Sequence, residues 1–243
     1  MTFSPHASVL VWPAATLPPA SMSADPEPFS RSGGPSLTNL NPAIRTDRGA
    51  WKIEYNNVTL VSPARQRTWD ALAAHLAGRS GLIAVPVWSF DSAPYAAGDL
   101  RSPRIVVPHS DATTFSDGAG YYQRKIVVKM HTLAALSATS VTLRVENAAA
   151  DMTGVKFSYE HAAYKTGPAT SVVGNLWTVP VTPAIRMQIP PGAELNFDLP
   201  TCLVRLKSDD AMRRGLDPAG NSVGSVSFEE ASDYWSNLAA GLL

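Results

Sequence analysis

The stretch from Trp51 to Tyr95 constrains the fold of this chain most, because consecutive patterns within it each fit one type of element. Over residues 51–60, large apolar residues alternate with polar ones, which is the period of a half-buried strand. Ser62 and Pro63 then form a typical helix start, since a serine side chain caps the first turn and proline favours the first helical position. The apolar spacing that follows predicts one packed helix over about residues 63–77.

A second strand is predicted directly after this helix. Residues 81–88 are rich in β-branched and aromatic residues, and Pro86 among them indicates a sheet edge or a bulge. Three tryptophans of the stretch, Trp51, Trp69 and Trp88, occupy positions that fit these periodic patterns. We therefore expect them to be core residues rather than a platform on which a sugar or a base stacks.

The composition excludes several classes of protein. A chain of 243 residues can bury a substantial core, as one large β-rich domain or as two domains of about 100 residues each. Basic and acidic residues number 20 each, so no overall field would attract nucleic acid or an anionic membrane. The single cysteine, Cys202, excludes an intramolecular disulfide and a cysteine-based zinc site, and its apolar neighbours predict an inert buried thiol.

Targeting and membrane-spanning patterns are not recognisable in the sequence. No segment has the pattern of a secretory signal, and no apolar run approaches the roughly 20 residues that cross a bilayer. We therefore expect a soluble chain that is made in the cytoplasm and has no membrane partner.

Residues 1–29 form a proline-rich segment. Six prolines and a Gly-Gly pair fall between residues 13 and 35, and this density excludes a helix or a central strand. We expect an extended N-terminal arm, which either crosses a neighbouring subunit or lies as a loop on the surface. Crossing a neighbour would bury Trp12 and Phe29, which are costly to leave in water.

Short β-prone segments dominate the chain after residue 100. The predicted strands are residues 105–107, 121–130, 140–146, 155–159, 171–173, 176–179, 202–206 and 222–228. Their spacing, with glycine, proline and asparagine between them, is typical of antiparallel barrels or sandwiches rather than of alternating β/α units. Residues 229–243 predict a short amphipathic helix. The sequence therefore predicts a mainly β fold.

Motifs for common enzyme and metal chemistry are absent from the sequence. It has no glycine-rich phosphate loop, no zinc-protease motif and no nucleophile elbow. The five histidines are scattered singly, without metal-ligand spacing: His6, His75, His109, His131 and His161. We expect no catalytic residues, no cofactor and no metal ion.

The best local polar cluster lies in the 109–117 loop and consists of His109, Asp111 and Asp117. It could hold a calcium ion or an acid/base pair, but it lacks the regular oxygen-ligand spacing of a calcium loop. A solvated loop is the simpler interpretation.

Two pairs of adjacent carboxylates, at residues 209–210 and 229–230, also invite a catalytic interpretation. Neighbouring residues on a strand point to opposite faces, and this weakens a glycosidase hypothesis based on either pair. Turn and helix-start roles are the alternative that we expect.

Two sets of short motifs resemble one family in the same order. The first set is Ser32-Gly-Gly-Pro-Ser36, Gly49-Ala-Trp-Lys-Ile53, the run at 62–72 and Gly78-Arg79. The second set is Pro183-Ala-Ile-Arg186, the runs at 191–200 and 202–206, Asp210-Ala-Met212 and the run at 224–230. Together they resemble a family of minor tail proteins of long-tailed bacteriophages, over residues 30–95 and 175–231. Where that family has a Pro-Pro-Leu-Arg run, this chain has Pro183-Ala-Ile-Arg186.

The resemblance implies a distal tail protein, which forms a ring at the tip of the tail and joins the tail tube to the hub or baseplate. Such proteins have a β-barrel or sandwich belt domain that forms the ring, often with a second β domain outside it. On this basis we assign residues 30–100 plus 182–243 to the belt and residues 101–181 to an inserted small β-barrel. Residues 1–29 are the arm.

The implied partners are further copies of the chain, the tail tube protein and the tail hub or baseplate protein. A hexameric ring is the first expectation and a trimer the second. The protein would be assembled in the host cytoplasm and located in the virion, and DNA would pass through the lumen without specific binding. Trp12, Phe29, Trp235 and Leu238 are the expected interface anchors, because they lie outside the periodic core pattern.

Two alternatives remain at the level of sequence. One is a carbohydrate-binding or receptor-binding module of a tail tip, with exposed aromatics on residues 101–181: Tyr121, Tyr122, Tyr159 and Tyr164. The other is a hydrolase that uses the 109–117 loop.

Overall fold

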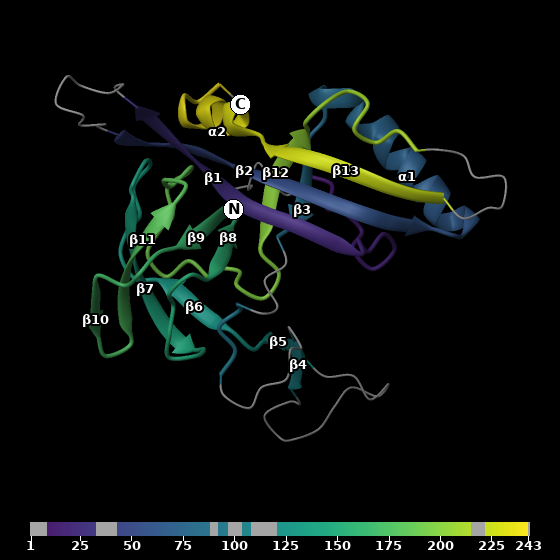
Figure 1. The fold of residues 1–243 in the computed structure, drawn as a ribbon. Coiled ribbons are helices and arrows are strands. Elements are labelled where there is room, and N and C mark those ends of the chain that lie inside the picture. Colours follow the sequence, from purple (N-terminus) through teal and green to yellow (C-terminus); the bar gives the residue numbers. More distant parts are fainter. Residues whose placement is uncertain are drawn as a thin grey trace.

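The structure is a computed structural model that describes residues 9–32, 43–87, 92–96, 104–107, 121–214 and 222–242. Figure 1 shows a long sheet that carries helix α1, and a second, strongly curved sheet beside it. Strands outnumber helices in the described residues, so the mainly β prediction is confirmed.

The helices are α1 (Pro63–Leu76), the short 3-10 helix η1 (Gly78–Ser80) and α2 (Ser232–Ala239). The strands are β1 (Ser21–Ser32), β2 (Ala43–Leu60), β3 (Ile83–Pro86), β4 (Arg104–Val107), β5 (Tyr121–Arg124), β6 (Val127–Met130), β7 (Ser140–Asn147), β8 (Lys156–Tyr159), β9 (Ala162–Thr166), β10 (Ser171–Val173), β11 (Leu176–Thr182), β12 (Thr201–Leu206) and β13 (Ser222–Glu230).

The first sheet is antiparallel and has the order β1-β2-β13-β12-β3. The alternation predicted for residues 51–60 is confirmed, because Trp51, Ile53 and Tyr55 of β2 are all fully buried. Pro86 belongs to β3, the last strand in this order, so the predicted sheet edge is confirmed as well.

Helix α1 covers one face of this sheet. The Ser62 side chain accepts a hydrogen bond from the backbone N–H of Arg65 at 3.3 Å, which is the predicted cap. Trp69, Leu72 and Leu76 form the buried stripe. The helix prediction is therefore confirmed, with an end at Leu76, one residue before the expected 77.

The N-terminal segment differs from the expected arm. Residues 21–32 form strand β1, which pairs antiparallel with β2 of the same chain. Pro26 and Pro28 fit there because β1 is an edge strand, which has no ladder to complete on its outer side. The register shifts between Glu27 and Phe29, next to these prolines. Proline density therefore excludes a central strand, as we reasoned. It does not exclude an edge strand that pairs within the same chain.

The second sheet is curved into a half-barrel with the order β6-β7-β11-β9-β8, and β10 pairs beside β11. Residues 193–196 run between its two outer strands. The backbone of this segment bonds to β6 at Val128 and Met130, and Asn196 exchanges two backbone hydrogen bonds of 2.9 Å with Ser158 of β8. Strands β4 and β5 form a separate two-stranded ribbon.

Two hydrophobic clusters fill the molecule, and β12 lies between them. Cys202, Val204 and Leu206 of this strand belong to the first cluster, between the first sheet and α1. Leu203 points to the opposite face and belongs to the second cluster, inside the half-barrel. The predicted burial of Cys202 is thus confirmed, and burial raises the pKa of its thiol.

The second cluster has members on both sides of the expected domain boundary. Of the residues after 182, which we assigned to the belt from the sequence, four members lie between β11 and β12: Ile185, Ile189, Leu195 and Phe197; Leu203, Ala231 and Trp235 belong to the cluster as well. A boundary between 181 and 182 therefore falls inside this cluster. Residues as far as Phe197 pack with the half-barrel, because the chain must pass back across the open side of that sheet before it reaches β12.

Gly224 of β13 allows α1 to lie close to the sheet. A Cβ at this position would stand 2.8 Å from the ring of Trp69, whose indole N–H is itself held by the Met212 carbonyl at 2.9 Å. We expect Gly224→Ala to lower the free energy of unfolding by about 1–3 kcal/mol, because the buried ring must move. Urea unfolding measures this, with Val223→Ala as a control that should change stability by less than about 0.5 kcal/mol, since Val223 is exposed. Equal stability of the two variants would contradict this close packing.

Candidate assembly surfaces

Two of the four expected interface anchors are core residues, which corrects the prediction. Trp12 and Trp235 are each 2% exposed within the single chain. They lie outside any local periodic pattern because distant segments bury them, Trp12 in the first cluster and Trp235 in the second. Leu238 is partly buried against the second cluster. Phe29 lies in β1 opposite Thr46, and its side chain is outside the described part of the structure.

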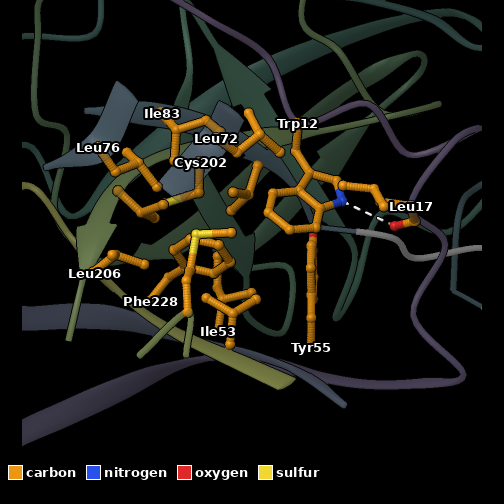
Figure 2. Packing of buried hydrophobic residues seen from close by; sticks show 14 of the residues in the cluster. Trp12, Leu17, Ile53, Tyr55, Leu72, Leu76, Ile83, Cys202, Leu206 and Phe228 are labelled. Atoms are coloured by element: carbon orange, nitrogen blue, oxygen red, sulfur yellow. Dashed lines mark hydrogen bonds between the residues drawn. The ribbon is translucent and has the colours of Figure 1, made fainter. Parts of the chain in front are cut away.

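Trp12 is at the centre of an aromatic cluster (Figure 2). Its ring meets those of Tyr55, Trp69 and Phe228 edge to face, with centroids 5.4, 6.0 and 5.7 Å away. Its indole N–H donates to the Leu17 carbonyl at 3.0 Å. The prediction that Trp51 and Trp69 are core residues is confirmed, whereas Trp88 lies outside the described residues.

A buried ion pair joins the two sheets. Arg186 follows β11, and its Nε donates to Glu230 Oε1 at 2.8 Å while its Nη2 donates to Oε2 at 3.2 Å. The Glu230 side chain is 1% exposed and that of Arg186 is 15% exposed. The same carboxylate accepts the backbone N–H of Trp51 at 3.0 Å, and the guanidinium donates to the Gly49 carbonyl at 2.5 Å. The pair therefore fixes β2 and β13 to the half-barrel.

Further contacts from β9 and β8 complete this cluster. The hydroxyl of Tyr164 accepts the backbone N–H of Arg186 at 3.0 Å, and the Trp51 indole N–H donates to the Ala163 carbonyl at 2.7 Å. Burial raises the pKa of the Tyr164 hydroxyl, so this group stays neutral. The ammonium of Lys156 lies 5.9 Å from the centre of the Trp51 ring. We call the set Gly49, Trp51, Tyr164, Arg186 and Glu230 the junction.

The junction unites residues from separate motifs of the sequence. Gly49 and Trp51 come from one motif, Arg186 from a second and Glu230 from a third. Sequence reasoning gave Glu230 only a turn or helix-start role and did not connect it with Arg186. A signal was available for Glu230, because it continues the inward alternation of Val226 and Phe228, and an acid at such a position needs a cation.

The adjacent carboxylates are separated as expected. Glu230 is buried and Glu229 is on the opposite, partly exposed face of β13, so they do not form a catalytic pair. They end a strand, however, and do not start a helix, which corrects part of the expectation. Asp209 and Asp210 lie in the turn after β12, as predicted.

The half-barrel covers part of the outer edge of β1. Lys156 donates to the Ala24 carbonyl at 2.6 Å, and Lys165 donates to Asp25 Oδ1 at 2.9 Å. Burial lowers the pKa of the Lys156 ammonium, more than the charge of Asp25 raises it. These two lysines occupy the strand edge next to the prolines.

The far end of β1 has neither of these features. Its last four residues, Phe29–Ser32, contain no proline and pair with residues 43–46 of β2. No other described strand pairs with them. We call residues 29–32 the open end of β1.

Charged side chains gather on the exposed face of β1, β2 and β13. Glu27, Glu54 and Glu229 surround Lys52, and they raise the pKa of its ammonium, chiefly through the hydrogen bond with Glu27. Other charged side chains share this face, since Asp25 is the cross-strand partner of Lys52 and Arg205 is that of Glu229.

The described residues offer little for catalysis. An open pocket of about 460 Å³ is lined by Ala77, Arg79, Ser80, Arg205 and Asp209. Asp209 accepts the backbone N–H of Arg79 at 3.0 Å, and Ser80 donates to the Ala77 carbonyl at 3.0 Å, so both groups serve local structure. Within the described ranges, no group of three or more His, Cys, Asp or Glu side chains could hold a metal ion. The 109–117 loop, with His109, Asp111 and Asp117, lies outside them.

Of the tyrosines proposed for a glycan surface, the two with described side chains are wholly or partly buried. Tyr164 is fully buried in the junction, which corrects its assignment as an exposed aromatic, and Tyr159 is partly buried against the second cluster. The side chains of Tyr121 and Tyr122 lie outside the described part of the structure.

No protein-family model matches the chain, and no curated protein matches it. Among the described residues, no helix combines the length and the hydropathy needed to cross a membrane.

Proposed function

We propose that the chain is a structural protein of a bacteriophage tail: a distal tail protein whose copies form a ring at the tail tip and connect the tail tube to the hub or baseplate. The observation that carries this proposal is the junction. Residues from three motifs that resemble the minor tail protein family meet there in one buried, hydrogen-bonded cluster. A largely buried cluster that bonds two sheets to each other holds two parts of a molecule in a fixed orientation, which is what a connector requires.

The two sheets provide the modules that such a connector needs. The first sheet with α1 is the ring-forming belt, and it takes its strands from both ends of the chain. The inserted small barrel is the half-barrel together with residues 193–196, which bond to both of its outer strands. In this proposal the insert extends to Phe197, farther than the motifs alone suggested.

Ring formation requires two different surfaces on each copy, because the contacts of a cyclic assembly are heterologous when more than two copies close it. The open end of β1 supplies one strand edge that another chain can extend. A hexamer is the expected assembly, with a trimer as the second possibility, and the faces of the ring would contact the tube and hub proteins.

In this proposal DNA passes through the lumen of the ring without specific binding. The balance of 20 basic and 20 acidic residues agrees with this, because it leaves no overall field that would attract the phosphate backbone.

Negative-stain electron microscopy of the purified protein tests the proposal. We expect ring-shaped particles of one diameter with a central hole. Particles without rotational symmetry at every concentration would contradict it. In that case an array of glycans, probed with the full chain, would test the receptor-binding alternative.

A further inference from the structure

We propose that the ribbon β4–β5 of one copy pairs with the open end of β1 on the next copy, so that a β-sheet continues across each subunit contact. This inference depends on the ring of the proposed function and identifies the contact that closes it.

The ribbon is an incomplete β element. Arg104–Val107 and Tyr121–Arg124 pair antiparallel and form a sheet of two strands that is separate from the other two sheets. A two-stranded ribbon is marginally stable in water and gains stability from a third strand. Neither outer edge of the ribbon pairs with another described strand.

The open end of β1 is the matching element. Earlier on β1, Lys156 and Lys165 occupy the edge, and Pro26 and Pro28 cannot donate to an added strand. Phe29–Ser32 lacks this protection and, among the described strands, pairs with β2 alone. This end has the same length as β4 and β5, which have four residues each.

The positions of the two elements require that the pairing joins different copies. In Figure 1 the ribbon lies at the bottom of the view, and the open end of β1 lies at the upper left, above the half-barrel. One copy therefore cannot pair them with each other. Pairing between copies joins two different surfaces, which generates a closed ring when the rotation per subunit closes, and a filament otherwise.

Engineered cysteines test this contact with little background. The only native cysteine, Cys202, is buried and has a raised thiol pKa. We would mix Ser30→Cys with each of four single variants that cover both ribbon strands and both faces: Ile105→Cys, Val106→Cys, Tyr122→Cys and Gln123→Cys. A short thiol-reactive cross-linker tolerates an offset of a residue or two in the register.

At least one mixture should give a cross-linked dimer on a denaturing gel, whereas Ser30→Cys alone should remain a monomer. The chain that carries both cysteines of the productive pair should give a ladder that stops at the number of subunits in the ring. Rings without a cross-link in any mixture would overturn the proposed contact and leave the ring intact. A ladder without an upper limit would support the contact and contradict the ring. Monomers without cross-links would contradict both.

A second variant tests the ribbon itself. Val106→Pro removes a backbone donor in β4 and should weaken assembly about tenfold or more, while Val106→Thr, which retains strand geometry, should assemble like the natural chain. The melting temperature of the monomer should be the same for both, because β4 and β5 form a sheet that is separate from the other two described sheets. If Val106→Pro assembled at the same protein concentration as the natural chain, the inference would be overturned.

Discussion

Replacing Trp12 with alanine should lower the free energy of unfolding by about 3–5 kcal/mol, the largest effect that we expect from a single apolar substitution. The side chain is 2% exposed and contacts three aromatic rings from β2, α1 and β13. Its removal would leave a cavity that these elements cannot close, because each is fixed by its own backbone hydrogen bonds.

Urea unfolding followed by circular dichroism measures this change. Leu10→Ala is a suitable control, since it precedes Trp12 by two residues, is 41% exposed and should cost less than about 1 kcal/mol. If Trp12→Ala were no less stable than Leu10→Ala, the N-terminal residues would be an arm and not part of the core.

Replacing Glu230 with alanine should be similarly damaging, at about 3–5 kcal/mol, because it leaves the buried guanidinium of Arg186 without its anion. The backbone N–H of Trp51 would lose its acceptor in the same variant. Glu229→Ala is the matched control: the neighbouring residue has the same side chain on the opposite face of β13 and should cost less than about 1 kcal/mol.

The double variant Arg186→Met/Glu230→Leu distinguishes two causes of lost stability: the loss of the ion pair itself, and the uncompensated charge that a single substitution leaves behind. It should be more stable than Glu230→Ala, because both charges are removed together. Equal stability of Glu230→Ala and Glu229→Ala in chemical unfolding would contradict the role assigned to the junction.

Elements with a local pattern are predictable from this sequence. The strand over residues 51–60 and helix α1 each show their own period, and Ser62 provides a cap within the chain segment itself. Strand β1 has no such pattern, because edge strands accept the prolines and polar residues that argue against a central strand.

Residues whose environment comes from distant segments are not predictable in this way. Trp12 is a tryptophan in a short run that ends at Pro13, and only the fold places Phe228 beside it. Glu230 is recognisable as an inward acid from its alternation, but its partner Arg186 lies 44 residues earlier and outside any strand. A single sequence carries no local signal that connects the two.

The mass of the purified chain in solution, measured by light scattering over a concentration series, tests the central claim most directly. The account predicts one closed species whose mass is six times 25.9 kDa and does not grow with concentration. A species of three times 25.9 kDa would still be a ring, with three subunits. A mass of 25.9 kDa at every concentration would contradict a ring formed by the protein alone.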